Sequence, residues 1–549
     1  MDYQSPLSML YHWENTNPDK VFLKQPIDNT WHAWTWKQVA AETRQLAAAI
    51  RSLDLPPQSN IVILSKNCAH WIICDLAIMM SGHVTVPIYP NLQATTVQQI
   101  LEHSEAKLLF VGKLDSWKSM KAGVPGYLKC ISLPFCNNDG CESWADFTCH
   151  HSPLQENIIR SSDEIATIIY TSGTTGMPKG VVFNFKSFGF VPHHAIGYLG
   201  FKNSDRFFSY LPLSHIAERM LVQMISLYVG GEVAFAESLQ QFPQNLREAR
   251  PTVFLGVHRI WSKFQEGILT KLPQRKLNLL LKIPIISTIT KKKIRKELGL
   301  NEASTILTGA APTPISLIKW FKSVGIIIQE AYAMTENCCY SHVSLQKNCK
   351  IGFVGQPLPA CEVKLSDENE IQIRHEALMT GYYKEPEKTT EVFTMDGFLK
   401  TGDEGLIDEQ GFLKITGRVK DLFKTAKGKY VAPSPIEMKL LGNSDLEHAC
   451  VVGSGLAQPL AITTLSTKSR KKSWAEIDNA LKETIKQVNT SLDSHERISK
   501  IVVVQDEWSV ENNMLTPSFK IKRNQIEKKY AAFYSLWSDG SSVVIRQAF

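Results

Sequence analysis

Helix-like and strand-like stretches alternate through about the first 360 residues of the chain. The segment from Trp36 to Leu53 has the pattern of a helix. Short runs rich in β-branched residues begin at Asn60, His83, Lys107, Ala166, Val253 and Gly325. Strands that alternate with helices are typical of βα units around a mostly parallel sheet. The pattern therefore predicts an α/β protein whose N-terminal part consists of βα-type sheets.

The pattern changes after about residue 360, where apolar and polar residues alternate with a period of two. That period, with turn residues at Glu409-Gln410-Gly411, predicts hairpins in place of βα units. Beyond Arg418 a charged segment leads into a short mixed tail that ends in basic, helix-like sequence. We expect a large N-terminal domain of residues 1–416 with a β-rich subdomain, a hinge at 417–421, and a small α+β domain of 422–549.

The bulk composition is typical of a folded protein and argues against nucleic-acid binding. Hydrophobic residues make up 44% and charged residues 21% of the 549 positions, and the formal net charge is +7. This mild positive charge permits attraction to anionic substrates or membrane surfaces. Because no basic patch is interleaved with aromatic residues at a spacing suited to base stacking, we expect no nucleic-acid partner.

The longest apolar region begins at His70 and predicts a buried helix followed by a buried strand. Asp75 and His83 interrupt it and prolines end it, so it is too broken to cross a bilayer. The first residues lack the basic start and apolar core of a secretory signal. We therefore expect a cytoplasmic protein.

Residues 271–300 form a basic amphipathic stretch in which lysines and arginines flank an apolar centre broken by Pro284. The pattern favours a pair of surface helices with solvated charges. It also leaves open a weak peripheral contact with a membrane surface, which would suit a substrate that partitions into lipid. The sequence does not indicate an oligomeric state.

Four of the 11 cysteines lie close together in the sequence, and two histidines follow them: Cys130, Cys136, Cys141 and Cys149, then His150 and His151. Structural zinc sites favour short C-x2-4-C pairs, which let two sulfurs reach one ion. The spacings here are wider and irregular. They favour scattered reduced thiols over a metal site.

The stretch YTSGTTGMPKG, residues 170–180, is dense in glycine and hydroxyl groups. Its spacing differs from a P-loop, because Gly173 and Gly176 are two residues apart and Lys179 follows Met177-Pro178. Strand-like sequence lies on both sides, so a helix N-terminus is not the expected anion-binding device. A glycine turn that presents backbone N–H groups, hydroxyls and one lysine suits a polyphosphate.

This loop resembles the phosphate loop of the adenylate-forming (AMP-binding) superfamily, and further motifs follow in that superfamily's order. They are LPLSHIAER from Leu211, GAAP from Gly309, YAMTE from Tyr332, TGD from Thr401, GRVKDLFKTAKGKYVAP from Gly417 and LTPSFKIKR from Leu515. Together they span about residues 165–525. The first and the last two are most similar to the long-chain acyl-CoA synthetase branch.

The resemblance implies a reaction in two halves. A fatty carboxylate attacks the α-phosphorus of ATP to give acyl-AMP and pyrophosphate, and the thiol of coenzyme A then displaces AMP. Peptide-synthetase domains usually carry a Phe-Asp pair that holds an amino group, where this chain has Leu213-Ser214-His215. A free amino acid is therefore a poor candidate. The alternatives left open are delivery to an acyl carrier protein and another aryl or alkyl acid.

The resemblance also implies the residues that hold ATP and Mg²⁺. Those that would hold the β- and γ-phosphates are Thr171, Ser172, Gly173, Thr174, Thr175, Gly176 and Lys179. Glu336 would ligate Mg²⁺ together with Thr171, and Thr335 would touch the α-phosphate. Tyr332 would stack on adenine, opposite a pocket wall made by Gly309, Ala310, Ala311 and Pro312. Asp403 would accept both ribose hydroxyls, and Arg418 would support the ribose or phosphates.

The resemblance gives Lys520 the central catalytic role, because the corresponding lysine bridges the carboxylate and the α-phosphate. The small domain would then rotate about Lys420, removing Lys520 and bringing Gly428 toward the pantetheine tunnel. His215 would line the carboxylate and thiol site, with a packed core histidine as the alternative. Lys522 and Arg523 are expected to be solvated or to face phosphate.

The chain departs from the superfamily's pattern at two places. Ala333 stands where a glycine is usual, and His258 stands where a proline is usual, near the presumed acyl tunnel. Trp261 is either a gate of that tunnel or a core tryptophan. These departures leave the acyl chain length open.

Overall fold

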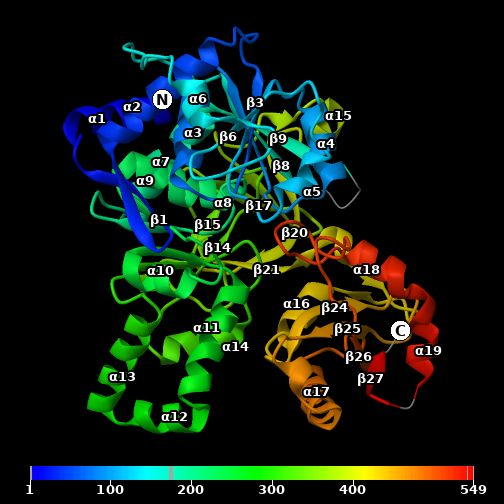
Figure 1. The fold of residues 1–549 in the computed structure, drawn as a ribbon. Coiled ribbons are helices and arrows are strands. Elements are labelled where there is room, and N and C mark those ends of the chain that lie inside the picture. Colours follow the sequence, from blue (N-terminus) through cyan, green and yellow to red (C-terminus); the bar gives the residue numbers. More distant parts are fainter. Residues whose placement is uncertain (1–2, 172–176, 541, 548–549) are drawn as a thin grey trace.

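The computed structural model describes residues 3–171, 177–540 and 542–547. Two large sheets with helices around them form the N-terminal part, and a smaller α/β body follows at the C-terminal end (Figure 1). The predicted α/β class, with a large N-terminal domain, a β-rich subdomain and a small C-terminal domain, is confirmed.

The first large sheet has eight strands in the order β19-β9-β8-β4-β3-β5-β6-β7. Their bounds are β3 (Asn60–Leu64), β4 (Val84–Ile88), β5 (Leu108–Val111), β6 (Cys130–Ser132), β7 (Glu142–Ser143), β8 (Ile165–Thr171), β9 (Lys179–Asn184) and β19 (Gly381–Tyr382). The strands from β8 to β7 run parallel, as the βα pattern predicts, and β9 pairs antiparallel with both β8 and β19. The helix predicted from Trp36 is α2 (Trp36–Arg51), and the apolar region after His70 forms α3 (Ala69–Met80) before β4.

The second large sheet has nine strands in the order β16-β15-β14-β13-β12-β10-β11-β1-β2. Their bounds are β1 (Val21–Ile27), β2 (Thr30–Thr35), β10 (Arg206–Ser209), β11 (Glu232–Phe235), β12 (Val253–Gly256), β13 (Thr305–Thr308), β14 (Gln329–Tyr332), β15 (His342–Val343) and β16 (Gln356–Pro357). The strand expected from Gly325 begins four residues later, at Gln329. The intervening isoleucines Ile326 and Ile328 are buried but lie outside the strand, because β-branched residues also suit an irregular core segment.

The hairpin region predicted after residue 360 is a four-stranded antiparallel sheet. It comprises β17 (Glu362–Leu365), β18 (Glu370–Arg374), β20 (Leu399–Ile407) and β21 (Leu413–Arg418). The predicted turn closes β20 onto β21, with the Gly411 N–H donating to the Asp408 carbonyl at 2.9 Å. Gly411 has φ 79°, which explains the glycine there.

The small C-terminal body has its own sheet and its own buried clusters. The sheet contains β24 (Leu446–Val452), β25 (Leu460–Leu465), β26 (Lys500–Val504) and β27 (Val544–Gln547). The helices around it are α16 (Pro433–Leu440), α17 (Trp474–Asn489), α18 (Arg523–Tyr530) and α19 (Tyr534–Asp539). A two-stranded ribbon of β22 (Phe423–Lys424) and β23 (Tyr430–Val431) precedes them.

A fully buried ion pair crosses the interior of the large domain. The Arg219 Nη2 atom lies 2.5 Å from Asp75 Oδ1, and both side chains have 0% exposure. Arg219 also donates to Thr167 Oγ1 at 2.6 Å, and Gln223 donates to Asp75 Oδ2 at 2.6 Å. This network joins α3, β8 and the π-helical turn Arg219–Met224. A charged residue inside an apolar helix, such as Asp75, indicates that an oppositely charged partner is buried beside it.

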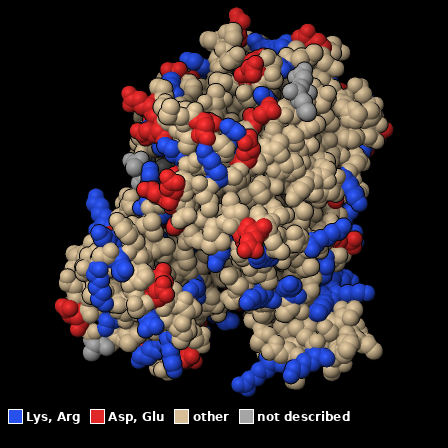
Figure 2. Space-filling view, turned by 180° about the vertical axis from the view of Figure 1, so that it is seen from behind, with Lys and Arg blue, Asp and Glu red and all other residues tan. Residues whose placement is uncertain are grey.

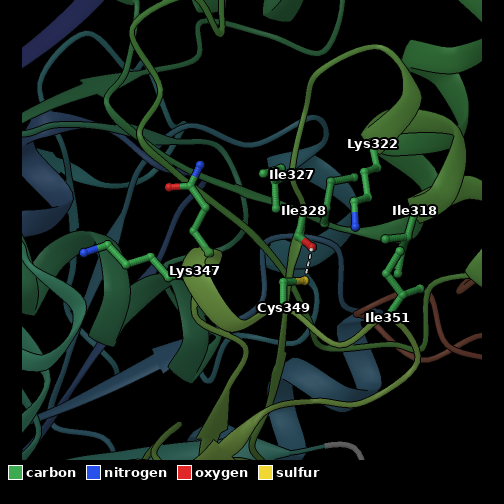
Figure 3. Close-up of a pocket in the computed structure, with 8 residues that line it drawn as sticks. Ile318, Lys322, Ile327, Ile328, Lys347, Cys349 and Ile351 are labelled. Atoms are coloured by element: carbon green, nitrogen blue, oxygen red, sulfur yellow. Dashed lines mark hydrogen bonds between the residues drawn. The ribbon is translucent and has the colours of Figure 1, made fainter.

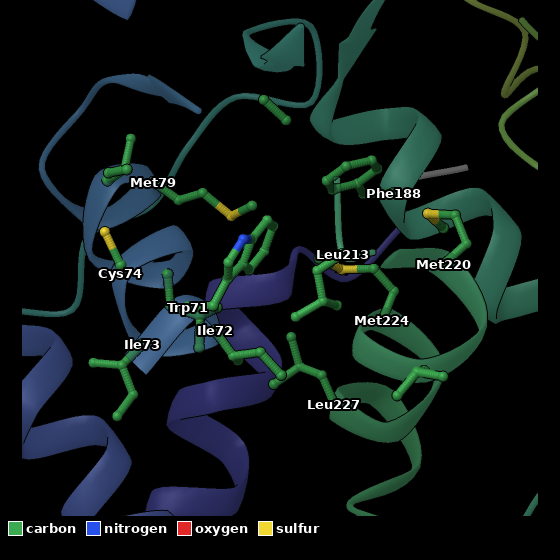
Figure 4. Packing of buried hydrophobic residues seen from close by; sticks show 14 of the residues in the cluster. Trp71, Ile72, Ile73, Cys74, Met79, Phe188, Leu213, Met220, Met224 and Leu227 are labelled. Atoms are coloured by element: carbon green, nitrogen blue, oxygen red, sulfur yellow. The ribbon is translucent and has the colours of Figure 1, made fainter. Parts of the chain in front are cut away.

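Apolar side chains enclose the pair. The Arg219 guanidinium lies 5.1 Å from the Phe188 ring centroid and 5.6 Å from that of Trp71. Figure 4 shows Trp71 and Phe188 projecting into the same interior as Met220 and Met224. Water cannot compensate for loss of either charge in such a place, so each partner depends on the other.

Asp75→Asn keeps the shape of the side chain but leaves Arg219 without its counter-ion. We expect a loss of about 3 kcal/mol in the free energy of unfolding, as when one partner of a buried pair is removed. Urea unfolding followed by tryptophan fluorescence measures it. The control is Asp115→Asn, whose ion pair with Lys66 is exposed and whose loss should cost under about 1 kcal/mol. Equal shifts for the two variants would contradict this account.

Candidate active site

The predicted phosphate loop connects the antiparallel strands β8 and β9. Thr171 pairs with Lys179 across the hairpin, and the Thr171 hydroxyl donates to the Lys179 carbonyl at 3.5 Å. The loop therefore joins strand to strand, as the sequence on both sides predicts. Ser172, Gly173, Thr174, Thr175 and Gly176 lie outside the described residues, so their phosphate contacts stay predictions.

The loop lysine and the predicted metal ligand approach the same tyrosine. The Lys179 Nζ atom lies 4.7 Å from the centroid of the Tyr382 ring. The Tyr382 hydroxyl donates to Glu336 Oε1 at 2.9 Å. Tyr382 was missed from the sequence, because its place beside Lys179 and Glu336 depends on the pairing of β19 with β9, about 200 residues away along the chain.

A tight turn presents Thr335 and Glu336. The Asn337 side chain, with 0% exposure, accepts from the Met334 N–H at 3.0 Å, and the Cys338 N–H donates to the Thr335 carbonyl at 2.9 Å. Cys338 has φ 54° and the following cysteine has φ 56°, a left-handed conformation that non-glycine residues rarely adopt. The buried asparagine and the strained backbone fix the direction of the Glu336 carboxylate.

The predicted nucleotide residues come together from three strands: Tyr332 ends β14, Arg418 ends β21, and Asp403 lies in the middle of β20. The Tyr332 hydroxyl donates to Asp403 Oδ2 at 2.8 Å, and Arg418 Nε lies 3.1 Å from Asp403 Oδ1. Burial and the neighbouring carboxylate raise the pKa of Tyr332, so its hydroxyl keeps its proton. Both oxygens of Asp403 thus have partners, which orient the carboxylate. The adenine and ribose roles themselves stay predictions.

The predicted pocket wall directly follows β13. Ala310 has φ 64°, and Ala310, Ala311 and Pro312 are exposed. A Cβ atom at Gly309 would lie 3.1 Å from the Ala331 carbonyl, which is tighter than most contacts allow. Gly309 therefore lets this segment pass close to the backbone just before Tyr332.

Lys520 is brought to this group from the small domain. Loss of hydration lowers its pKa, and the charge of Arg418 acts in the same direction, while Asp403 and Glu336 oppose both. The side chain nevertheless remains exposed to solvent. Two domains therefore contribute cationic and anionic groups whose charges interact.

His215 lies within the electrostatic reach of Lys520. Its Nδ1 atom accepts from the Ala217 N–H at 3.1 Å, which leaves Nε2 as the protonated nitrogen. Burial lowers the pKa of His215 to about 4, and the Lys520 charge adds to this. The ring is therefore neutral near pH 7. Its half-buried position beside Lys520 favours the site interpretation over a core histidine.

The contacts that hold the small domain in this arrangement are mainly polar and charged. The Arg259 guanidinium donates to His448 Nε2 and lies 3.9 Å from Glu447, and Lys468 lies 3.6 Å from Glu266. Asn91 donates to the Pro517 carbonyl at 3.1 Å, and Gln93 donates to the Glu511 carbonyl at 2.6 Å. The Arg259 guanidinium lies 5.4 Å from the centroid of the Phe519 ring. A cavity of about 190 Å³ opens at this junction, lined by Arg259 of the large domain and by residues of the small domain. Junctions of this kind are expected to permit domain motion.

The expectation for Arg523 is wrong. Its Nη2 atom lies 2.7 Å from Glu437 Oε1, its Nη1 donates to the Val451 carbonyl at 2.8 Å, and its Nε lies 3.6 Å from Asp421 Oδ2. Arg523 therefore links α16 and β24 to Asp421 of the predicted hinge, and its side chain is largely withdrawn from solvent. Lys420, the predicted pivot, is exposed. Gly428 lies in the turn between β22 and β23 with φ 76°, and its approach to a tunnel stays a prediction.

Trp261 and His258, which the sequence analysis associates with the predicted acyl tunnel, both lie in helix α11 (His258–Lys271). Trp261 has 0% exposure and packs against the buried rings of Phe254 and Phe321, and a Cβ atom at Gly256 would lie 2.5 Å from its ring. The core interpretation of Trp261 is therefore favoured. His258 lies 3.2 Å from the Ser262 hydroxyl, and burial lowers its pKa to about 4.

A second cavity of about 170 Å³ lies beside helix α14 (Ile315–Ser323), which contributes Ile318 and Lys322 to its wall (Figure 3). Ile318, Ile328 and Cys349 are among its lining residues, and the Cys349 thiol donates to the Ile328 carbonyl at 3.7 Å. It shares no residue with the predicted site.

No group of three or more histidine, cysteine or acidic side chains is arranged to hold a metal within the part of the chain that the structure describes. Glu336 is a single oriented carboxylate. Mg²⁺ commonly binds through one or two carboxylates together with substrate phosphates, so Glu336 fits an ion that arrives with a nucleotide.

Comparison with known families decides the membership of the chain. A family model described as AMP-binding enzyme matches residues 10–383, and one described as AMP-binding enzyme C-terminal domain matches residues 420–533. The chain belongs to the AMP-binding enzyme family. The predicted resemblance to that superfamily is thereby confirmed.

Similar curated proteins cover nearly the same length. The long-chain-fatty-acid–CoA ligase FadD15 of Mycobacterium tuberculosis is 28% identical over 97% of this chain and 96% of that protein. The long-chain-fatty-acid–CoA ligase ACSBG2 of Homo sapiens is 26% identical over 91% of this chain and 87% of that protein.

Solved structures share the fold at lower identity. The anthranilate CoA ligase AuaEII in complex with anthranoyl-AMP has a TM-score of 0.80 at 20% identity, covering 97% of this chain and 98% of that one. The o-succinylbenzoate CoA synthetase MenE of Bacillus subtilis, in complex with its acyl-adenylate, has a TM-score of 0.75 at 22% identity, covering 96% and 99%.

Tyr382→Phe removes the hydroxyl that orients Glu336. If Glu336 binds Mg²⁺, the Mg²⁺ concentration for half-maximal ATP–pyrophosphate exchange should rise about 10-fold, as is usual when a ligand loses its outer hydrogen bond. The matched control is Tyr383→Phe, whose hydroxyl accepts from Asn60 instead. An unchanged Mg²⁺ dependence in Tyr382→Phe would remove Tyr382 from the site.

Proposed function

We propose that the chain activates a long-chain fatty acid with ATP and Mg²⁺ and transfers the acyl group to coenzyme A. Family membership and the named relatives support adenylate-forming acyl–CoA ligation. Beyond this general activity, we propose that the acid has a long alkyl chain. It is supported by the segments LPLSHIAER, KTAKGKYVAP and LTPSFKIKR and by relatives named for long-chain acids.

The observation that carries the proposal is the position of Lys520. Its charge lies among those of Glu336, Asp403 and Arg418, although it belongs to a different domain. A carboxylate and ATP repel each other, and a cation between them lowers that repulsion and aligns the attack. No group on the protein has to act as nucleophile, because the acid itself attacks.

Each side chain then has one task in the first half-reaction. Lys179 stabilises the departing pyrophosphate, and Asp403 with Arg418 holds the ribose. Glu336 binds the Mg²⁺ that accompanies the nucleotide and supplies positive charge next to the phosphates. The neutral His215 donates through Nε2 toward the bound carboxylate without adding a second charge beside Lys520.

In the second half-reaction the small domain rotates about Lys420 and withdraws Lys520. The coenzyme A thiol then attacks the acyl-AMP carbonyl and AMP leaves. The polar and charged character of the contacts at Asn91, Gln93 and Arg259 supports such a motion, since water can replace contacts of this kind when the domains move. The cytoplasmic location expected from the sequence is also part of the proposal.

A second candidate is activation of an aryl acid, because two of the similar solved structures are named for anthranilate and o-succinylbenzoate. Likeness at 20–22% identity extends to the fold and not to the substrate. The long-chain proposal is therefore preferred.

Lys520→Ala should lower acyl-AMP formation about 100-fold or more, as expected when an oriented charge stabiliser is lost. Thioester formation from supplied acyl-AMP should stay near the level of the unaltered protein. Pyrophosphate release and acyl–CoA formation measure the two halves separately. Lys522→Ala is the matched control two residues away, since Lys522 bonds Asn513 instead. Equal damage to both halves would contradict the proposed rotation.

A panel of acids from about six to twenty carbons, with anthranilate and o-succinylbenzoate added, tests the substrate class through AMP formation. We expect turnover to be highest with the long alkyl acids and with coenzyme A as acceptor. The parallel reactions contain a holo acyl carrier protein in place of coenzyme A. Thioester that forms only on the carrier, or turnover only with the aryl acids, would overturn the proposal.

A further inference from the structure

A helical hairpin extends from the large domain at the lower end of Figure 1. Helix α11 (His258–Lys271) leads into α12 (Gln274–Lys282) at the far end, and α13 (Pro284–Glu297) returns toward the body of the domain (Figure 1). Leu277 of α12 and Ile294 of α13 are buried in the same cluster as Trp261. The inner face of the hairpin is therefore anchored to the body of the domain.

The outer side of the hairpin is apolar and exposed. Large apolar side chains lie in the solvent at its turn and on the adjoining helix ends: Leu279 (64% exposed), Ile283 (50%), Ile285 (77%), Ile286 (37%) and Ile289 (61%). Single exposed apolar residues are common, but five within eleven consecutive positions form a contiguous patch. We call these five residues the apolar tip.

Positive charge surrounds the apolar tip. Residues 271–300 contain nine lysines and arginines and one acidic residue, Glu297, which pairs with Lys271 at 3.4 Å. The nine are Lys271, Arg275, Lys276, Lys282, Lys291, Lys292, Lys293, Arg295 and Lys296. Figure 2 shows the corresponding lobe, at the lower right, with blue side chains around a tan surface.

We propose that this hairpin docks onto the surface of membranes that contain anionic lipid. The apolar tip enters the boundary between headgroups and acyl chains, and the lysines lie against the lipid phosphates. The positive charge of the hairpin favours anionic lipid as its partner. A second copy of the chain would present the same positively charged hairpin and repel the first.

The contact is peripheral. Helices α12 and α13 contain 9 and 14 residues, whereas about 20 apolar residues are needed to cross a bilayer. Among the described residues, no helix has the length and apolar character of a membrane span. Stable attachment without a span usually takes an apolar anchor together with a polybasic patch, and the hairpin supplies both.

The inference goes beyond the proposed function and does not depend on it, since it uses only the hairpin. The two agree, however, because a long-chain acid partitions into lipid and would reach the protein from there. Helix α11 connects the hairpin to the strand β12 beside the presumed acyl tunnel.

Co-sedimentation of the full chain with vesicles tests the proposal. Vesicles of phosphatidylcholine alone are compared with vesicles that contain about one-third phosphatidylglycerol. We expect binding to the anionic vesicles, and a loss of roughly 10-fold or more in the partition coefficient for Ile285→Asp with Ile289→Asp. Lys292→Gln with Lys293→Gln should lose about 5-fold for each charge at low salt. That second loss should shrink in about 1 M salt.

Matched controls separate docking from unspecific effects. Ile159→Asp changes another exposed isoleucine (87% exposed) away from the hairpin, and Lys118→Gln with Lys486→Gln removes two exposed charges elsewhere. Both controls should bind like the unaltered chain, and thermal unfolding midpoints should stay unchanged in all four.

Three outcomes would overturn the proposal. They are no binding of the unaltered chain to anionic vesicles, equal binding by the hairpin variants, and self-association that the Ile→Asp changes abolish in the absence of vesicle binding. The last would assign the apolar tip to a second copy of the chain.

Discussion

The buried ion pair between Asp75 and Arg219 sets the relation between the parts of the active site. Desolvation of two charges is costly, so the pair is favourable only when α3, β8 and the turn that follows LPLSHI meet with correct geometry. Arg219 lies four residues after His215, and its partner Thr167 lies four residues before Thr171. One network in the core thus fixes Thr171, where the predicted phosphate loop begins, relative to His215.

The other half of the site depends on antiparallel pairing at sheet edges. β19 pairs with β9 and carries Tyr382 to Lys179 and Glu336, and β20 pairs with β21 and places Asp403 opposite Arg418. Lys520, in contrast, belongs to the small domain and not to the strands of the large domain that carry these residues. It is held at a junction of polar and charged contacts, while Arg523 joins α16 and β24 within the small domain. A separately folded domain on such a junction suits the proposed withdrawal of Lys520.

Much of the site was predictable because its residues stand in compact motifs. Tyr332, Thr335 and Glu336 lie within five positions, and the glycine-threonine loop lies between two recognisable strands. Tyr382 was not predictable, because a tyrosine in a Gly-Tyr-Tyr run has no distinct chemistry until its neighbours are known. Arg523 was mistaken for a solvated charge because the buried Glu437 that binds it lies 86 residues away.

Local sequence was enough to establish the α/β class and the family and to name the chemical groups of the candidate site. These follow from local periodicity and from short motifs, which need no knowledge of distant contacts. The three-dimensional structure was needed to show which carboxylate accepts which hydrogen bond, that Trp261 is a core residue, and which apolar residues of the basic hairpin are exposed. Burial and pairing between segments far apart in the chain arise from long-range packing, and no local pattern encodes them.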